Sequence, residues 1–213
     1  MSSKLSVNVY INMIKNFLII VVLLVSSILS AKQWVEVYSD SPLESSFSYE
    51  SEGLASTRIT FKLSGYFTDN SKNGLKVTSP GGVSLLEKGA PDLPIFSTSI
   101  QVPDLAEMGI EIIESEFVEL NINDITPSKG NVTRDVNIGS LPFEKGYRYR
   151  QNSLYPAEIS FLRRPHIIRS VRGQAVVFQP FQYNPVLGVL RIYTDIVFCL
   201  LYTSPSPRDG LLS

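Results

Sequence analysis

The stretch AVVFQPFQYNPVLGVLRIYTDIVF, residues 175–198, decides the fold class of this chain. Two runs rich in β-branched and aromatic residues, 175–181 and 189–198, flank the turn-forming segment 182–188 (QYNPVLG). This order is typical of two strands joined as a hairpin by a longer loop. The sequence therefore predicts that the two runs pair with each other.

Alternating patterns elsewhere in the chain also predict strands. Ile59, Phe61 and Leu63 alternate with polar residues, and residues 34–38 (WVEVY) alternate in the same way. A period of two is expected of strands that bury one face. Between such runs, Asn73-Gly74 is a dipeptide that accepts positive φ and predicts a tight hairpin turn.

Residues 110–122 are compatible with two kinds of element. Ile113 and Phe117 belong to a set at helical spacing, whereas Val118 and Leu120 belong to a set at strand spacing. The β-branched content of the segment favours a strand. Because the chain shows no internal repeat and no linker, we predict a single all-β domain, either a β-sandwich or an open barrel.

The N-terminal segment has the order of a secretory signal. Lys15 precedes the apolar run 17–25, and small residues follow as far as Ala31. The run is shorter than the roughly 20 apolar residues that a transmembrane helix needs. We therefore expect residues 1–31 to be a signal peptide, with Met13 as an alternative start, and the mature chain to keep no stable membrane anchor.

The composition argues against several classes of function. With 19 basic and 20 acidic residues, no global field attracts nucleic acid. Cys199 and His166 are the single members of their types, so an internal disulfide and a cluster of Cys and His metal ligands are both impossible. No nucleotide-binding or hydrolase motif is present. We expect no cofactor, no metal and no catalytic residue; an enzyme would need Cys199 and His166 within hydrogen-bond reach.

A basic stretch interleaved with tyrosines extends over residues 145–172. Such a stretch is either a solvated face or a docking surface for an acidic partner, since Arg and Tyr are favoured interface anchors. The predicted docking residues are Arg148, Arg150, Arg163, Arg164 and Arg169. In an alternative function, that of a β-sandwich adhesin or carbohydrate-binding module, exposed aromatic residues would form a platform: Tyr147, Tyr149 and Tyr155.

A turn framed by Pro127 and Gly130 precedes the sequence NVTRD, residues 131–135. These small polar residues predict an exposed loop that presents Arg134. A protruding arginine suits a pocket with a carboxylate at its floor, because the planar guanidinium can pair with both carboxylate oxygens. An ordinary surface arginine is the competing interpretation. The candidate loop residues are Lys129, Thr133, Arg134 and Asp135.

The chain changes character after Phe198. Residues 199–213 (CLLYTSPSPRDGLLS) contain a Ser-Pro-Ser-Pro run that ends any strand. The segment resembles translated adapter or vector sequence. We therefore expect the natural protein to continue beyond Phe198, with a natural disordered tail as the alternative.

Four stretches resemble the propeptide domain of gingipain-type cysteine peptidases of Bacteroidota. The longest is 171–197; the others are 87–94 (EKGAPDLP), 125–130 (ITPSKG) and 155–158 (YPAE). The resemblance covers residues 50–198 and indicates a propeptide domain at residues 32–198.

The resemblance implies a β-sandwich that packs on its cognate catalytic domain in cis, inhibits the zymogen, assists its folding and export, and is removed on maturation. It implies a secreted or cell-surface location, reached through the periplasm, and a full-length cysteine endopeptidase of which this segment is the non-catalytic part. In arginine-specific members, a loop arginine just after the Pro-Ser-Lys-Gly turn occupies the specificity pocket. Arg134 falls at that place, although Asp135 adds a negative charge beside it.

Overall fold

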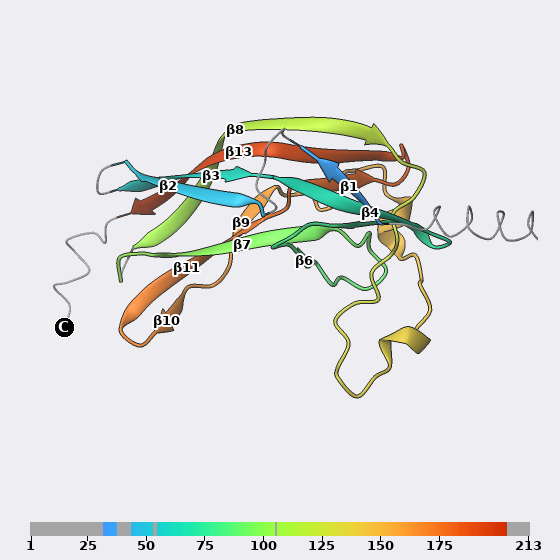
Figure 1. The fold of residues 1–213 in the computed structure, drawn as a ribbon. Coiled ribbons are helices and arrows are strands. Elements are labelled where there is room, and N and C mark those ends of the chain that lie inside the picture. The colour runs from blue at the N-terminus through green and yellow to red at the C-terminus, as the bar shows by residue number, and fades with distance from the viewer. Residues whose placement is uncertain (1–31, 38–43, 53–54, 105, 204–213) are drawn as a thin grey trace, which may run out of the picture. The chain divides into compact units, whose positions relative to one another are not determined.

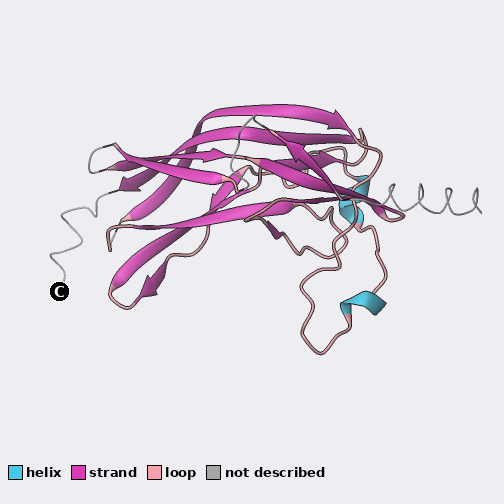
Figure 2. Ribbon diagram, in the orientation of Figure 1, coloured by secondary structure: helices cyan, strands magenta, loops and turns pink. Residues whose placement is uncertain are grey.

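The computed structural model describes residues 32–37, 44–52, 55–104 and 106–203, so the predicted signal peptide lies outside the described residues. Nearly all of them belong to one compact unit, Trp34–Ser213. Figure 2 shows that the unit is built of strands and loops with two short 3-10 helices. Among the described residues, no helix has the length and apolar character needed to cross a membrane. The all-β fold class is confirmed.

The elements in chain order are β1 (Gln33–Glu36), β2 (Ser46–Ser51), β3 (Ser56–Lys62), β4 (Gly65–Ser71), β5 (Gly74–Thr78), β6 (Val83–Ser84), β7 (Pro94–Gln101), β8 (Glu107–Asn121), η1 (Ile138–Ser140), η2 (Tyr147–Arg150), β9 (Ser160–Leu162), β10 (His166–Ile168), β11 (Val171–Phe178), β12 (Phe181–Asn184) and β13 (Val189–Thr203).

Two five-stranded antiparallel sheets form the layers of the domain (Figure 1). The first has the order β10-β11-β7-β6, with β9 also paired to β11; the second has the order β12-β13-β3-β2, with β8 also paired to β13. A third sheet consists of β1, β4 and β5. Strand β13 organises the second sheet, because it pairs with β8 along one edge and with β12 and β3 along the other.

The core lies between the two large sheets and is rich in aromatic rings. The ring centroid of Phe61 in β3 lies 5.7 Å from that of Phe178 in β11 and 5.0 Å from that of Phe96 in β7. Phe198 in β13 lies 4.6 Å from Phe178. Rings from the two sheets are therefore in direct contact, which makes the domain a β-sandwich, one of the two predicted architectures.

The predicted alternation of residues 59–63 agrees with the structure, whereas Trp34 and Val35 in β1 are both half-buried and do not alternate. Ile59, Phe61 and Leu63 are fully buried. Residues 110–121 belong to β8, so the strand interpretation of that segment is correct. The last strand, β13, continues past the predicted boundary at Phe198, and Leu200 is fully buried.

The predicted pairing of residues 175–181 with 189–198 is correct only at its end, where Phe181 pairs with Ile192. β11 pairs with β7, β9 and β10, whereas the hairpin partner of β13 is the separate strand β12. The break falls at Gln179-Pro180, because proline has no N–H to offer to a ladder. The carbonyl of Pro180 instead accepts a hydrogen bond from the backbone of Tyr193 at 2.8 Å. The hairpin exists, but it is shorter than predicted and turns at residues 185–188.

The hairpin turn predicted at Asn73-Gly74 is centred one residue earlier. The register of β4 and β5 sets Ser71 opposite Gly74, so Lys72 and Asn73 form the turn. Gly74 has a φ of 116°, a value that favours glycine. The prediction of a glycine-dependent turn is therefore correct, and only its centre is displaced.

Candidate functional site

The predicted loop residues lie in the long connection between β8 and β9. This connection contains no strand and includes η1 and η2. In Figure 1 its yellow part, which carries η1, extends away from the two sheets. We refer to residues 129–145 as the projecting loop. It contains Lys129, Thr133, Arg134 and Asp135.

Both ends of the projecting loop are fastened to one turn, residues 87–90. Before the loop, the Ser128 N–H donates to the Ala90 carbonyl at 2.8 Å, and the Gly89 N–H donates to the Ser128 carbonyl at 2.9 Å. After the loop, the Gly146 N–H donates to the Gly89 carbonyl at 2.7 Å. The loop is thus closed at its base in the manner of an Ω-loop. The EKGAPDLP motif supplies that base.

Gly89 is required at the base by its conformation and by its surroundings. It has a φ of 76°, where a side chain is strained. A Cβ at this position would also lie 3.0 Å from the Gly146 backbone nitrogen. Any other residue would therefore push Gly146 away from the 87–90 turn.

Lys129 braces the projecting loop from within. Its Nζ donates to the Ile138 carbonyl at 2.8 Å and lies 4.2 Å from the centroid of the Phe143 ring. These contacts join the first residues of the loop to η1 and to the returning segment. A cation held by a carbonyl and an aromatic face is a structural group. Lys129 is therefore a support of the loop, whereas the sequence analysis named it only among the candidate loop residues.

Arg134 and Asp135 form an exposed turn of the projecting loop. Within the described part of the chain, the Arg134 side chain makes no hydrogen bond or ion pair. The Asp135 carboxylate accepts a hydrogen bond from the Thr133 hydroxyl, and this bond, together with one to its own backbone N–H, holds the pKa of Asp135 below its usual range. The loop thus presents a free guanidinium beside a carboxylate that is bonded internally.

The five arginines of the predicted docking surface lie in two places. The first place is η2, directly after the projecting loop; the second is the region around β10, which Figure 1 shows at the other end of the sheets. In the first group are Arg148 and Arg150, and in the second are Arg163, Arg164 and Arg169. A continuous basic stretch in the sequence therefore becomes two separate surfaces.

Arg148 takes part in an internal network of hydrogen bonds and aromatic contacts. Its Nε donates to Glu87 Oε1 at 3.0 Å, and its guanidinium lies 4.8 Å and 5.1 Å from the ring centroids of Tyr147 and Tyr155. The Tyr155 hydroxyl donates to the second oxygen of Glu87 at 3.0 Å, and burial raises the pKa of this tyrosine. Because Tyr155 is buried and Tyr149 is half-buried, the tyrosines do not form the exposed platform of a carbohydrate-binding module.

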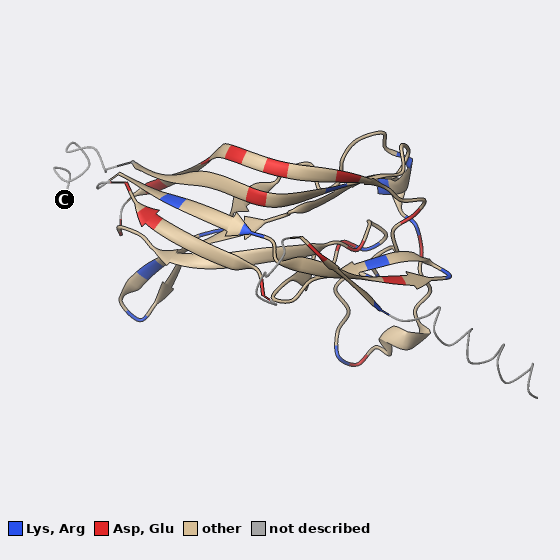
Figure 3. Cartoon of the chain, turned by 45° about the horizontal axis from the view of Figure 1, so that its top comes forward, with Lys and Arg blue, Asp and Glu red and all other residues tan. Residues whose placement is uncertain are grey.

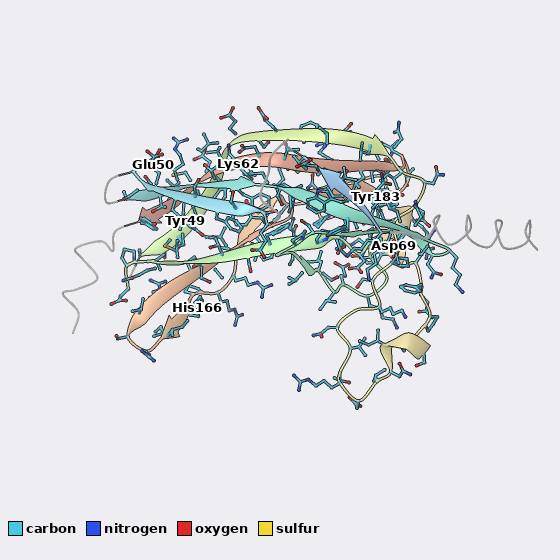
Figure 4. All side chains as sticks on the ribbon, viewed as in Figure 1. Tyr49, Glu50, Lys62, Asp69, His166 and Tyr183 are labelled. Carbon is cyan, nitrogen blue, oxygen red and sulfur yellow. The ribbon has the colours of Figure 1, made fainter. Side chains whose placement is uncertain are left out.

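Cys199 and His166 do not form a nucleophilic pair. Cys199 is buried in β13, whereas His166, labelled in Figure 4, belongs to β10 in the other large sheet. The His166 ring packs against Gly173, where a Cβ would lie 2.6 Å from Nε2. In the described ranges, no group of three or more His, Cys, Asp or Glu is placed to hold a metal ion. The chemically distinctive feature of the domain is its projecting loop.

The domain is thus a β-sandwich that carries an arginine-bearing loop closed at its base. Residues 48–209 match the Propeptide_C25 family, and the chain belongs to that family. The resemblance noted in the sequence is therefore confirmed, and this segment is a gingipain propeptide domain, not itself catalytic.

The relatives of the chain are gingipains of Porphyromonas gingivalis. Gingipain R1 is 45% identical over 130 residues, which are 61% of this chain and 13% of that protein. Gingipain R2 of strain ATCC 33277 is 39% identical over 159 residues, which are 73% of this chain and 22% of that protein. The chain thus spans less than a quarter of the length of either relative.

Two solved structures share the fold. The complex of the pro- and mature domains of RgpB from P. gingivalis has a TM-score of 0.68 at 36% identity, covering 74% of this chain and 85% of that one. A structure solved to explain the zymogenic latency of gingipain K from the same organism also has a TM-score of 0.68, at 17% identity, covering 81% of this chain and all of that one. The second likeness concerns the fold alone.

Proposed function

We propose that this domain is the N-terminal propeptide of a secreted cysteine endopeptidase and that it inhibits the peptidase by placing Arg134 in its specificity pocket. The observation that carries the proposal is the free Arg134 side chain on a loop that is closed at its base and braced by Lys129. Such a loop is preorganised, so little conformational entropy is lost when it binds.

The rigidity of the projecting loop explains how a substrate-like arginine can inhibit. A peptidase cleaves a bound peptide only when the scissile bond reaches the geometry of attack, and an error of about 1 Å can cost on the order of 100-fold in rate. The hydrogen bonds at Gly89 and the contacts of Lys129 oppose such an adjustment. The bond after Arg134 is therefore held as a poor substrate, and Asp135 keeps a carboxylate next to it.

The partner is the catalytic domain of the same precursor. Protease–inhibitor complexes bury about 1,600 Å² in total, roughly half of it on each partner. Exposed Arg150 on η2 directly follows the projecting loop and extends the contact surface. Arg148 supports this surface from behind through Glu87. In this proposal the sandwich acts as a rigid holder for the loop.

The proposal also includes the fate of the chain during export. The relatives are gingipains, a group of secreted or surface proteases. We assign residues 1–31 to a signal peptide and the domain proper to residues 32–198, which would keep the peptidase inactive through the periplasm and assist its folding and export.

The proposal is tested by inhibition of a related peptidase. Residues 32–213 would be mixed with the mature domain of RgpB, and the inhibition constant measured. We expect Arg134→Ala to weaken inhibition by more than about tenfold, because truncation of a central anchor typically costs at least that much. Arg150→Ala is the matched control and should have a smaller effect. An unchanged inhibition constant for Arg134→Ala would remove this residue from the mechanism.

A further inference from the structure

The tip of the β10–β11 hairpin exposes apolar side chains on both of its faces. Ile167 is 74% exposed, Ile168 64% and Val171 42%. Successive residues of a strand point to opposite faces, so the two isoleucines project in opposite directions. Val171 pairs with Ile168 across the hairpin. Neighbouring apolar side chains in contact with water on both sides of a ribbon indicate a binding element.

The same hairpin is basic. Arg163, Arg164 and Arg169 are exposed, and within the described ranges their side chains make no ion pair. The sequence contains no acidic residue between Glu158 and Asp195. In Figure 3 the hairpin, at the lower left, carries Lys or Arg positions and no Asp or Glu. The apolar tip is therefore flanked by free cations.

Two carboxylates lie near the base of the hairpin. Asp104 and Glu107 border a surface hollow together with Arg163. Arg164 and Arg169 are exposed and make no ion pair within the described ranges, so these two residues carry the positive charge that a partner can reach.

Arg169 occupies a backbone conformation that ordinarily selects glycine. Its φ is 58°, and the pairing of Ile168 with Val171 makes Arg169 and Ser170 the two residues of the turn. Two-residue hairpin turns with positive φ at the first position usually have glycine there. Local strain of this kind often accompanies function. Here it places a guanidinium at the extreme end of the ribbon.

The base of the hairpin is fixed, so the tip is held in a defined position. Nη1 of Arg172 donates to the carbonyls of Pro103 and Ala106, each at 3.0 Å. The Val102 N–H donates to the Arg172 carbonyl at 3.0 Å. These bonds tie β11 to the segment that follows β7. The exposed tip is therefore a projection from a rigid sheet.

We propose that the β10–β11 tip binds an anionic phospholipid surface. Ile167, Ile168 and Val171 would enter the boundary between headgroups and acyl chains, while Arg164 and Arg169 pair with lipid phosphates. A flat protein surface would cover one face of the ribbon and leave an isoleucine of the other face in water. A fluid lipid interface surrounds the ribbon and covers both faces. The inference is independent of the inhibitory role of Arg134.

Vesicle flotation tests the proposal without any peptidase. Residues 32–213 would be mixed with phosphatidylcholine vesicles and with vesicles in which phosphatidylglycerol replaces roughly a third of that lipid. We expect binding to the anionic vesicles alone, and its loss in high salt because exposed charges are then screened. Each of Arg164→Gln and Arg169→Gln should weaken binding about fivefold, and Ile167→Ser combined with Ile168→Ser about tenfold or more.

Matched variants separate the tip from the rest of the domain. Leu187→Ser removes an apolar residue that is 63% exposed in the β12–β13 turn, and Arg150→Gln removes a distant arginine; both should bind vesicles as the unaltered chain does. Arg169→Gly removes the charge and relieves the backbone strain. It should weaken vesicle binding while leaving the midpoint of thermal unfolding unchanged or higher, which a loss of folding would not do.

Two results would overturn the proposal. The first is equal binding of the unaltered chain to neutral and anionic vesicles, or no binding to either. The second is that Arg164→Gln, Arg169→Gln and the isoleucine variants bind vesicles normally but inhibit the mature RgpB domain more weakly, which would assign the tip to the peptidase. Failure of the Arg134→Ala test would leave the vesicle result unaffected, since no peptidase is present.

Discussion

Replacement of Gly89 by alanine should loosen the projecting loop more than it destabilises the sandwich. A side chain at the φ of 76° costs about 1 to 2 kcal/mol. The added Cβ would lie 3.0 Å from the Gly146 nitrogen and 3.1 Å from its Cα. These are backbone atoms that cannot rotate away, so the 2.7 Å hydrogen bond from Gly146 to Gly89 is strained or lost, at a cost of about 1 kcal/mol.

Gly81→Ala provides the matched control. Gly81 has nearly the same φ, 75°, but a Cβ there would meet only a Phe96 ring atom at 3.9 Å. The cost of a side chain at positive φ is therefore the same in Gly81→Ala and Gly89→Ala, whereas the backbone clash occurs only in Gly89→Ala. We expect urea unfolding of residues 32–213 to show Gly89→Ala as less stable than Gly81→Ala by about 1 kcal/mol.

Gly89→Ala and Gly81→Ala should also differ in how strongly they inhibit the mature RgpB domain. Loss of about 1 kcal/mol of preorganisation in the loop weakens binding about fivefold, whereas Gly81→Ala leaves the loop closed. If both variants inhibit as well as the unaltered domain, the closed base of the loop has no part in inhibition. If both weaken inhibition equally, the effect comes from general destabilisation and the reasoning fails.

Three further outcomes follow from the described contacts. Phe61→Ala should lower the free energy of unfolding by about 3 to 5 kcal/mol in urea titrations, because Phe61 is fully buried among rings of both sheets. A loss below about 1 kcal/mol would contradict that packing. Burial raises the pKa of Tyr183 to about 12, above its ordinary value of about 10, so the neutral phenol is favoured in the folded state. The stabilisation of the folded state by the neutral Tyr183 phenol is fully present below about pH 10 and is lost as the pH rises towards 12. Tyr183→Phe should therefore reduce the loss of unfolding free energy at alkaline pH. Identical plots of unfolding free energy against pH for both proteins would refute the raised pKa of Tyr183. Thr133→Val should raise the pKa of Asp135 towards its usual value in a carboxyl NMR titration, since the hydrogen bond from the Thr133 hydroxyl is the main cause of the lowered pKa. An unchanged pKa of Asp135 would show that the turn has a different geometry.

Local patterns in the sequence predict those parts of the fold that depend on neighbouring residues. The alternation of Ile59, Phe61 and Leu63 defines the buried face of β3, and the strand content of residues 110–121 is visible in their β-branched side chains. The pairing of strands depends on distant partners. β13 pairs with β3 and β8 across large sequence separations, and no turn signal specifies such a register.

The hairpin error has a particular cause. A run of β-branched and aromatic residues looks continuous from position 175 to 181, yet Pro180 cannot donate to a ladder and divides it into two strands of different sheets. Pro180 is thus the sequence signal that ends the first strand before position 180.

The candidate site, like the fold, could be predicted from the sequence only where it depends on neighbouring residues. The exposure of the 131–135 segment follows from its turn-forming residues, whereas the supporting contacts join segments far apart in the sequence. Arg148 and Glu87 are 61 residues apart, and Gly89 meets Gly146 across a similar interval. The roles of Lys129 and Gly89 as supports therefore emerge only from the folded chain.

The central claim is that Arg134 occupies the active site of the peptidase. Its most direct test compares binding of residues 32–213 to the mature RgpB domain with a free active site and with one blocked by an irreversible inhibitor. We expect blocking to weaken binding of the unaltered domain by more than about tenfold and to have little effect on Arg134→Ala, since the two changes remove the same interaction. Equal binding of the unaltered domain to the free and blocked peptidase would contradict it.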